Sequence, residues 1–277
     1  MEKIIFPIAF FASLALTAQE HRVSTASDNV FVITDTMYIP QLDRTRGIWI
    51  YLPPDYDTDY KYYPVLYMHD GQNLFEDTTS FMGEWGVDET LDSLFANGYE
   101  VPIVIGINNG GMQRIEELTP WSNEKYGGGD GDLYMQFIVE SLKPEVDKRY
   151  RTLPEAINTA IFGSSLGGLI SVYGGLKYNN AFHKIGAFSP SFWYADSVYT
   201  FVENATISPN TRILLLGSEL EDSTMVTDMI KIETLMASKM PSEQLKVVGT
   251  SDGAHSEWFW KREFPDAIVW LMELKRE

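Results

Sequence analysis

The sequence contains no cysteine among its 277 residues. This absence excludes disulfides, thiolate metal sites, a cysteine nucleophile and lipid attachment through an N-terminal cysteine. Basic residues are also scarce, because 21 Lys and Arg stand against 39 Asp and Glu and leave a net charge of −18. A surface this acidic repels nucleic-acid phosphates and anionic lipid. We therefore expect no nucleic acid and no membrane surface among the partners.

Long apolar runs are missing beyond the N-terminus, where one apolar stretch covers residues 4–18. This stretch follows a single lysine, is short for a bilayer span, and ends in Leu16-Thr17-Ala18, which resembles a small-residue cleavage site. We interpret residues 1–18 as a signal peptide cut near Ala18, with a retained N-terminal anchor as the alternative. Residues 19–277 then form a single domain of a periplasmic or secreted protein, which has no membrane contact after cleavage.

Hydrophobic residues make up 44% of the chain, which is enough for a substantial core, and short apolar runs alternate with longer amphipathic ones. The short runs predict strands over residues 30–33, 47–52, 65–68, 102–107, 157–162, 185–188, 212–216 and 245–248. The amphipathic runs predict helices over residues 87–95, 133–150, 166–176, 225–240 and 257–274, the last kinked or broken at Pro265. This alternation predicts an α/β fold with a parallel sheet covered on both faces, whose ligands bind beyond the carboxyl ends of the strands.

One pentapeptide, GSSLG at residues 163–167, fits the pattern G-x-S-x-G. The pattern is weak alone, but a predicted strand precedes it and a predicted helix follows it. In that setting a sharp turn lifts the central serine, Ser165, above the sheet as a nucleophile, and Gly163 and Gly167 keep the turn free of side chains. The alternative is a turn in which Ser165 only caps the helix.

A serine hydroxyl needs an adjacent base to attack at neutral pH, and the chain has only four histidines. His21 is near the mature N-terminus, His69 precedes the nucleophile, and His183 follows a helix at the opposite end of the sheet. His255 lies in a polar loop between the last predicted strand and the last helix. This order, with the base after the nucleophile, favours His255. A surface histidine that caps the helix is the alternative.

The acid that orients the histidine should follow the strand at residues 212–216. Three carboxylates lie there, on Glu219, Glu221 and Asp222, and spacing alone does not choose among them. At least two must be solvated loop acids, or an N-cap in the case of Asp222. We take Glu221 first, Asp222 second and Glu219 third.

With these residues assigned, the chain resembles the esterase-D and enterochelin-esterase group of α/β-hydrolases, which includes the feruloyl and acetylxylan esterases of carbohydrate esterase family one. The resemblance covers most of the mature chain. Its motifs are MHDGQNLF (residues 68–75), EWGVD (84–88), VIGINN (104–109), GSSLGG (163–168), FSPSFW (188–193) and GAHSE (253–257). It implies the α/β-hydrolase fold, with a central, mostly parallel eight-stranded sheet and helices on both faces.

The resemblance also implies site residues. In the group the acid stands in a Gly-x-x-Glu context, which supports Glu221, although Ser218 and Glu219 replace a frequent glycine and leave the register uncertain by one residue. An oxyanion hole would be formed by the backbone N–H groups of Gln72 and Leu166. His69 and Asp70 would brace the loop that carries Gln72.

The sequence thus predicts a serine esterase that hydrolyses carboxylic esters without a metal or organic cofactor. By analogy with the group, its substrate is a small-molecule or oligosaccharide ester of the acetyl or feruloyl type. Trp85 and Trp193 are the aromatic residues expected to contact it. The alternatives are a siderophore trilactone esterase, disfavoured because no basic cluster lies near the motifs, an acyltransferase or peptidase on the same triad, and a non-catalytic glycan-binding module.

Overall fold

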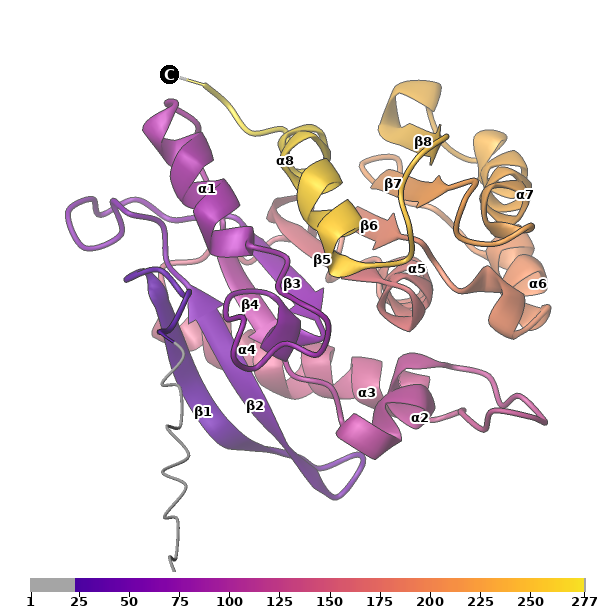
Figure 1. The fold of residues 1–277 in the computed structure, drawn as a ribbon, viewed down its shortest axis with the longest axis horizontal. Helices are drawn as coiled ribbons and strands as arrows, with labels where there is room; N and C mark the ends of the chain where they lie inside the picture. The colour runs from indigo at the N-terminus through magenta and orange to yellow at the C-terminus, as the bar shows by residue number, and fades with distance from the viewer. Residues whose placement is uncertain (1–22, 277) are drawn as a thin grey trace, which may run out of the picture.

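An eight-stranded sheet forms the centre of the molecule in the computed structural model, which describes residues 23–276 (Figure 1). The predicted signal peptide lies outside the described residues. The strand order is β1-β2-β4-β3-β5-β6-β7-β8. The six strands from β4 to β8 in this order run parallel to one another, whereas β2 pairs antiparallel with both of its neighbours, β1 and β4. The strands are β1 (Val30–Ile39), β2 (Arg44–Tyr51), β3 (Val65–His69), β4 (Ile103–Ile107), β5 (Thr159–Ser164), β6 (Lys184–Phe188), β7 (Arg212–Ser218) and β8 (Leu245–Thr250).

Helices cover both faces of the sheet, as the continuous burial of the inner strands requires. On β3, Val65 and Tyr67 point into one hydrophobic core, and Leu66 and Met68 point into the other, because side chains of a strand alternate between its faces. Helices α1 (Val87–Ala96) and α8 (Glu257–Met272) close the second core (Figure 1). Helices α3 (Gly131–Phe137), α4 (Lys143–Arg149), α5 (Leu166–Lys177), α6 (Ser197–Asn204) and α7 (Met225–Ala237) close the first. The predicted α/β-hydrolase architecture is confirmed.

Several element boundaries differ from the prediction. Strand β1 is longer, because its polar residues face solvent and bulges interrupt its register with β2. The helix predicted over residues 133–150 consists of α3, a π-helical turn (Ile138–Leu142) and α4. This turn ends two residues before Pro144, which has no N–H to donate to the preceding helical turn. Helix α8 is not broken at Pro265. Helices α2 (Arg114–Leu118) and α6 were not predicted, because both are too short for a clear periodicity.

The loops after β3, β5, β6, β7 and β8 leave the sheet from the same edge, because these strands are parallel. These loops carry every residue predicted to act in catalysis. Among the helices of residues 23–276, none has the length and apolar character needed to cross a membrane.

Candidate active site

Ser165 stands at the turn between β5 and α5, as the pentapeptide predicts. Its backbone is strained, with φ 59° and ψ −124°, a conformation that residues other than glycine rarely adopt. A Cβ at Gly163 would lie 2.7 Å from the backbone of Gly167, so the sharp turn requires glycine at that position. At Gly167 a Cβ would instead approach His69 at 3.3 Å, so this glycine serves close packing against the β3 loop.

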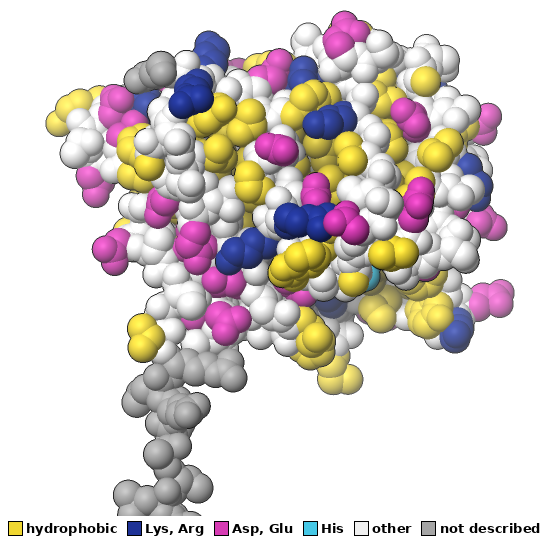
Figure 2. Space-filling model, turned by 45° about the horizontal axis from the view of Figure 1, so that its top comes forward, with side chains coloured by type: hydrophobic (Ala, Val, Ile, Leu, Met, Phe, Trp, Pro, Cys, Tyr) yellow, Lys and Arg dark blue, Asp and Glu magenta, His cyan; other side chains and the backbone are white. Residues whose placement is uncertain are grey.

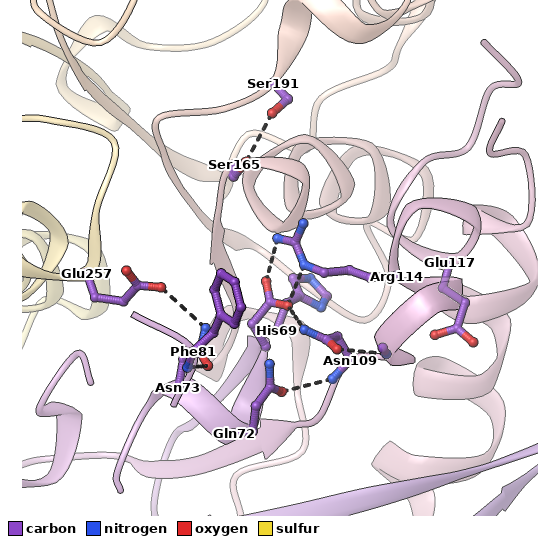
Figure 3. A network of polar contacts seen from close by, with 12 residues as sticks. His69, Gln72, Asn73, Phe81, Asn109, Arg114, Glu117, Ser165, Ser191 and Glu257 are labelled. Carbon is purple, nitrogen blue, oxygen red and sulfur yellow. Dashed lines mark hydrogen bonds and ion pairs between the residues drawn. The ribbon is translucent and has the colours of Figure 1, made fainter. Parts of the chain in front are cut away.

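The hydroxyl of Ser165 faces Ser191 in the resting structure. Its Oγ lies 3.3 Å from Ser191 Oγ, and the Ser191 N–H donates to the Ser165 carbonyl at 3.1 Å (Figure 3). Ser165 and His255 line the same cleft, which has a volume of about 590 Å³. Within residues 23–276, no hydrogen bond joins these two side chains. The structure therefore brings them to one cleft without connecting them directly.

His255 and Glu221 form a direct pair, with 2.6 Å between His255 Nδ1 and Glu221 Oε2. The histidine ring is 41% exposed, whereas the Glu221 side chain is 1% exposed. The other carboxylate oxygen, Oε1, accepts hydrogen bonds from the Ser189 hydroxyl at 2.8 Å and the Ser218 N–H at 2.7 Å. Such a pair holds Nδ1 protonated and leaves Nε2 of the imidazole available as a base.

The two other candidate acids have different surroundings. Asp222 Oδ1 accepts hydrogen bonds from the N–H groups of Thr224 and Met225, at 2.7 and 2.8 Å, and so caps the start of α7. Glu219 is exposed, and its N–H donates to the Thr250 carbonyl. Of the three carboxylates, Glu221 is the one that the structure places against His255.

The backbone N–H groups of Gln72 and Leu166 begin the short 3-10 helix η1 (Gly71–Asn73) and helix α5. In the part of the chain that the structure describes, neither N–H has an acceptor. A Cβ at Gly71 would lie 2.6 Å from the backbone of Gly106, so only glycine lets this loop pack so closely on β4. The Gln72 side chain is fixed by the Asn109 N–H, which donates to its Oε1 at 3.1 Å (Figure 3).

His69 and Asp70 brace this loop, as the sequence indicated. Arg114 donates two hydrogen bonds to the Asp70 carboxylate, at 2.7 and 2.9 Å, and Asn109 Nδ2 donates a third at 2.6 Å (Figure 3). Burial alone would raise the pKa of Asp70, but the charge and hydrogen bonds of Arg114 outweigh burial and lower it. His69 Nδ1 lies 2.8 Å from the Tyr134 hydroxyl, and burial lowers the pKa of His69 to about 4.

The prediction that Trp85 contacts substrate is wrong. Trp85 is only 3% exposed and stacks on Phe188, with 5.6 Å between ring centroids, because α1 and α8 close over it. Trp193 is 49% exposed and packs edge-on against Tyr126. It is not among the described residues that line the cleft, and its contact with substrate stays a prediction.

Sequence reasoning missed other residues of the cleft. Phe81 lines the cleft and is 84% exposed, and its position in the polar run TTSFMG was a usable signal. Glu257 also lines it, and Asn73 Nδ2 donates to its Oε1 at 3.4 Å (Figure 3). Burial, followed by a smaller effect of Asp70, raises the pKa of Glu257. Nothing in the sequence singled out Arg114, because only the fold brings α2 beside η1.

The surface around the cleft mixes apolar and charged side chains. Figure 2 shows hydrophobic, acidic and basic side chains intermixed on one face of the molecule, with a histidine side chain visible among them. Among the cleft residues, Arg114 and Asp70 neutralise one another, which leaves Glu257 as an additional carboxylate. Within residues 23–276, no cluster of three or more His, Asp or Glu side chains is arranged to hold a metal ion.

Comparison with known proteins identifies esterases among the proteins that this chain resembles. A family model described as "Putative esterase" matches residues 39–271. The chain is 29% identical over 241 residues to the uncharacterized protein YbbA of Bacillus subtilis (strain 168), an alignment that covers 82% of this chain and 92% of YbbA. It is also 30% identical over 166 residues to the siderophore triacetylfusarinine C esterase of Aspergillus fumigatus, covering 56% of this chain and 55% of that protein.

Solved structures share the fold. The siderophore hydrolase EstB from Aspergillus nidulans superposes with a TM-score of 0.71 at 17% identity, covering 91% of this chain and 98% of EstB. A ferulic acid esterase superposes with a TM-score of 0.68 at 20% identity, covering 88% of this chain and 99% of that protein. Because the family model spans most of the sequence, the chain belongs to this esterase family and has its α/β-hydrolase fold.

Proposed function

We propose that the protein is a serine carboxylic-ester hydrolase that works through an acyl-enzyme. Ser165 Oγ attacks the ester carbonyl while His255 Nε2 accepts the hydroxyl proton. The tetrahedral intermediate collapses, and His255 passes that proton to the departing alcohol. Water then attacks the acyl-serine with His255 as base, which releases the acid and restores Ser165. Glu221 holds the imidazole through Nδ1 and stabilises its positive charge.

One observation carries this proposal: the buried Glu221 carboxylate lies 2.6 Å from His255 in the cleft that contains the strained Ser165. To react, the Ser165 hydroxyl must leave Ser191 and form a hydrogen bond with His255. A serine side chain can change rotamer, and catalytic hydrogen bonds often tighten only when substrate is bound. The N–H groups of Gln72 and Leu166 would stabilise the oxyanion, and the loss of one such donor typically costs about 3 kcal/mol of barrier.

We propose a neutral small or sugar-linked ester of the acetyl or feruloyl type as substrate. The cleft supports a neutral substrate, because Arg114, the single Lys or Arg among its described lining residues, is already paired with Asp70. Polar side chains of Asn73, Thr79 and Ser80 offer hydrogen bonds to hydroxyl groups. The signal-like N-terminus supports export to the periplasm or the medium.

Hydrolysis of a siderophore ester is the second candidate. It is favoured by the 30% identity to the siderophore triacetylfusarinine C esterase. A strongly anionic ferric chelate is disfavoured, because the single Arg among the described residues of the cleft is already paired with Asp70 and offers no free positive charge.

Release of p-nitrophenol from p-nitrophenyl acetate tests the proposed mechanism. We expect hydrolysis by the natural chain and a loss of kcat of at least about a thousandfold in Ser165→Ala. Ser171→Ala is the matched control, because Ser171 is buried in α5 and donates to the Gly167 carbonyl. Equal activity of Ser165→Ala and the natural chain would refute the serine mechanism. If neither the natural chain nor Ser165→Ala hydrolyses the ester, the alternative of a non-catalytic glycan-binding module would be favoured.

A panel of esters tests the proposed substrate. We expect acetylated or feruloylated oligosaccharides to be cleaved with a higher kcat/KM than a ferric trilactone. The opposite order would favour the siderophore candidate. Faster formation of acylated product than of free acid, when an alcohol acceptor is added, would reveal an acyltransferase.

A further inference from the structure

A buried chain of hydrogen-bond donors lies behind the carboxylate of Glu221. The indole N–H of Trp260 donates to Ser189 Oγ at 2.8 Å, and the Ser189 hydroxyl lies 2.8 Å from Glu221 Oε1. Ser189 is fully buried, and Trp260 is nearly so. The three residues come from α8, the loop after β6 and the loop after β7, so the chain joins three separate segments.

The direction of these hydrogen bonds is determined by chemistry. An indole N–H can only donate, and an ionised carboxylate can only accept. Ser189 must therefore accept from Trp260 and give its single hydroxyl proton to Glu221. A hydroxyl that accepts one hydrogen bond is polarised and donates the next one more strongly, particularly to a charged group in a buried site.

The consequence is a carboxylate held in one orientation. Ser189 and the Ser218 N–H both bind Oε1, which leaves Oε2 for His255 at 2.6 Å. The Trp260 ring also packs edge-on against the His255 ring, with centroids 5.1 Å apart and planes at 83°. Trp260 therefore contacts the proposed base directly and reaches the proposed acid through Ser189.

The backbone of Ser189 has an unfavourable conformation. Its φ is 45°, in the left-handed region that favours glycine, and its N–H donates to the Leu216 carbonyl at 2.6 Å. Strained residues persist where their surroundings hold them in place, and they often occur at functional sites. Five described residues other than glycine have positive φ values: Asp43, Asp70, Ser165, Ser189 and Glu273. Asp43 lies in the exposed turn between β1 and β2 and Glu273 ends α8, whereas Asp70, Ser165 and Ser189 lie in loops that follow β3, β5 and β6.

We propose that Ser189 and Trp260 are positioning residues that orient the Glu221 carboxylate and limit how strongly it holds His255. This inference rests on the proposed function, in which Glu221 and His255 act as acid and base. Ser189 is fully buried, and Trp260 lines the cleft but reaches the proposed acid only through Ser189. Loss of the Ser189 hydroxyl should therefore change how the site responds to pH and how fast it turns over, and leave substrate binding nearly unchanged.

Ser189→Ala in the full chain is the first test. We expect kcat for p-nitrophenyl acetate to fall about tenfold, as for the loss of one hydrogen bond to a buried charge, while KM stays within about twofold. Without this donor Glu221 binds the imidazolium more tightly, so the acid limb of the kcat/KM profile should move to higher pH. The other charged groups near His255 are unchanged: Asp70, Arg114 and Glu257, which line the cleft with it, and the Asp252–Arg262 pair, whose Asp252 lies in the same loop.

Trp260→Phe is the second test, because it keeps an aromatic ring and removes the N–H. We expect a smaller loss of kcat with the same direction of pH shift. The double variant should lose less than the product of the single losses, because both residues act through one chain. Ser171→Ala and Trp270→Phe are the matched controls: Ser171 is a buried serine of α5, and Trp270 lies on α8 beside Arg212. Both should keep the natural pH profile.

The proton resonance of His255 Nδ1–H gives a readout that does not depend on turnover. It should shift in Ser189→Ala and stay in place in Ser171→Ala. An unchanged resonance together with an unchanged pH profile in Ser189→Ala would overturn the inference. If Ser189→Ala is unchanged in this way while Ser165→Ala abolishes activity, the positioning role fails and the proposed function stands. Full activity of Ser165→Ala would instead refute the proposed function itself.

Discussion

Two neighbouring carboxylates, Glu221 and Asp222, differ in role because they differ in partners. Glu221 is buried and receives hydrogen bonds from His255, Ser189 and Ser218. Asp222 is exposed and accepts hydrogen bonds from the backbone N–H groups of Thr224 and Met225, at the start of α7. A carboxylate that caps a helix stabilises the fold, whereas one that binds an imidazole controls its tautomer.

Substitution of these two residues should separate the roles. We expect Glu221→Gln to lower kcat by roughly 10³- to 10⁴-fold, because an amide can favour the wrong histidine tautomer. Asp222→Asn should keep kcat within a fewfold, since asparagine also caps helices, and Asp222→Ala should cost about 1 kcal/mol in the free energy of unfolding. Steady-state kinetics and urea unfolding of each variant are the measurements. The reverse pattern of kcat would move the proposed acid to Asp222.

At the scale of an element, the η1 turn depends on close contact with β4. Gly71 lies against the backbone of Gly106 and Ile107, and the turn is tied to α2 through Asp70 and Arg114. Main-chain atoms cannot move aside as a flexible side chain can, so the position of the Gln72 N–H depends on the absence of a side chain at Gly71.

Gly71→Ala should therefore displace the turn. A Cβ would meet Gly106 C at 2.6 Å and Ile107 N at 2.7 Å. We expect kcat to fall about a hundredfold, as for the loss of an oxyanion donor, with a smaller change in KM. Gly249→Ala is the control, because its Cβ would approach only a methyl group of Val226, at 3.1 Å. A Gly71→Ala variant with natural kcat would show that the turn does not depend on this contact.

For the molecule as a whole, the buried His69 links stability to pH. Its pKa falls from an ordinary 6.5 to about 4 on folding, because burial disfavours the charged ring. Between these values the unfolded chain binds a proton that the folded protein does not. This contribution to stability is complete above pH 6.5 and is lost as the pH falls toward 4.

Urea unfolding at pH 7 and pH 5 measures this linkage. We expect the His69 contribution to the free energy of unfolding to drop by about 2 kcal/mol between these pH values. His69→Gln removes that titration and should lose correspondingly less stability over the same interval. Burial also lowers the pKa of His183, so some pH dependence of the same sign remains in the variant. Equal losses in the natural chain and His69→Gln would contradict the assignment.

Much of the fold could be predicted, because the apolar and polar residues of its main strands and helices follow clear local patterns. The continuous apolar runs of β3, β4 and β5 identified buried parallel strands, and the glycines around Ser165 identified the sharp turn. His255 was found by elimination among four histidines, and its position after the last strand agreed with the order of the family. Polar β1 and the short helices α2 and α6 lacked such periodicity and were missed or shortened.

The sequence by itself determined the sheet, its helical layers and the edge at which the site lies, because strand and helix periods are local properties of the chain. Only the tertiary structure decided which of three loop acids meets His255, that Trp85 is buried, and that Trp260 and Ser189 stand behind Glu221. These outcomes depend on contacts between segments far apart in the chain. Side-chain contacts of this kind follow from how the layers pack, and no local pattern of residues encodes them.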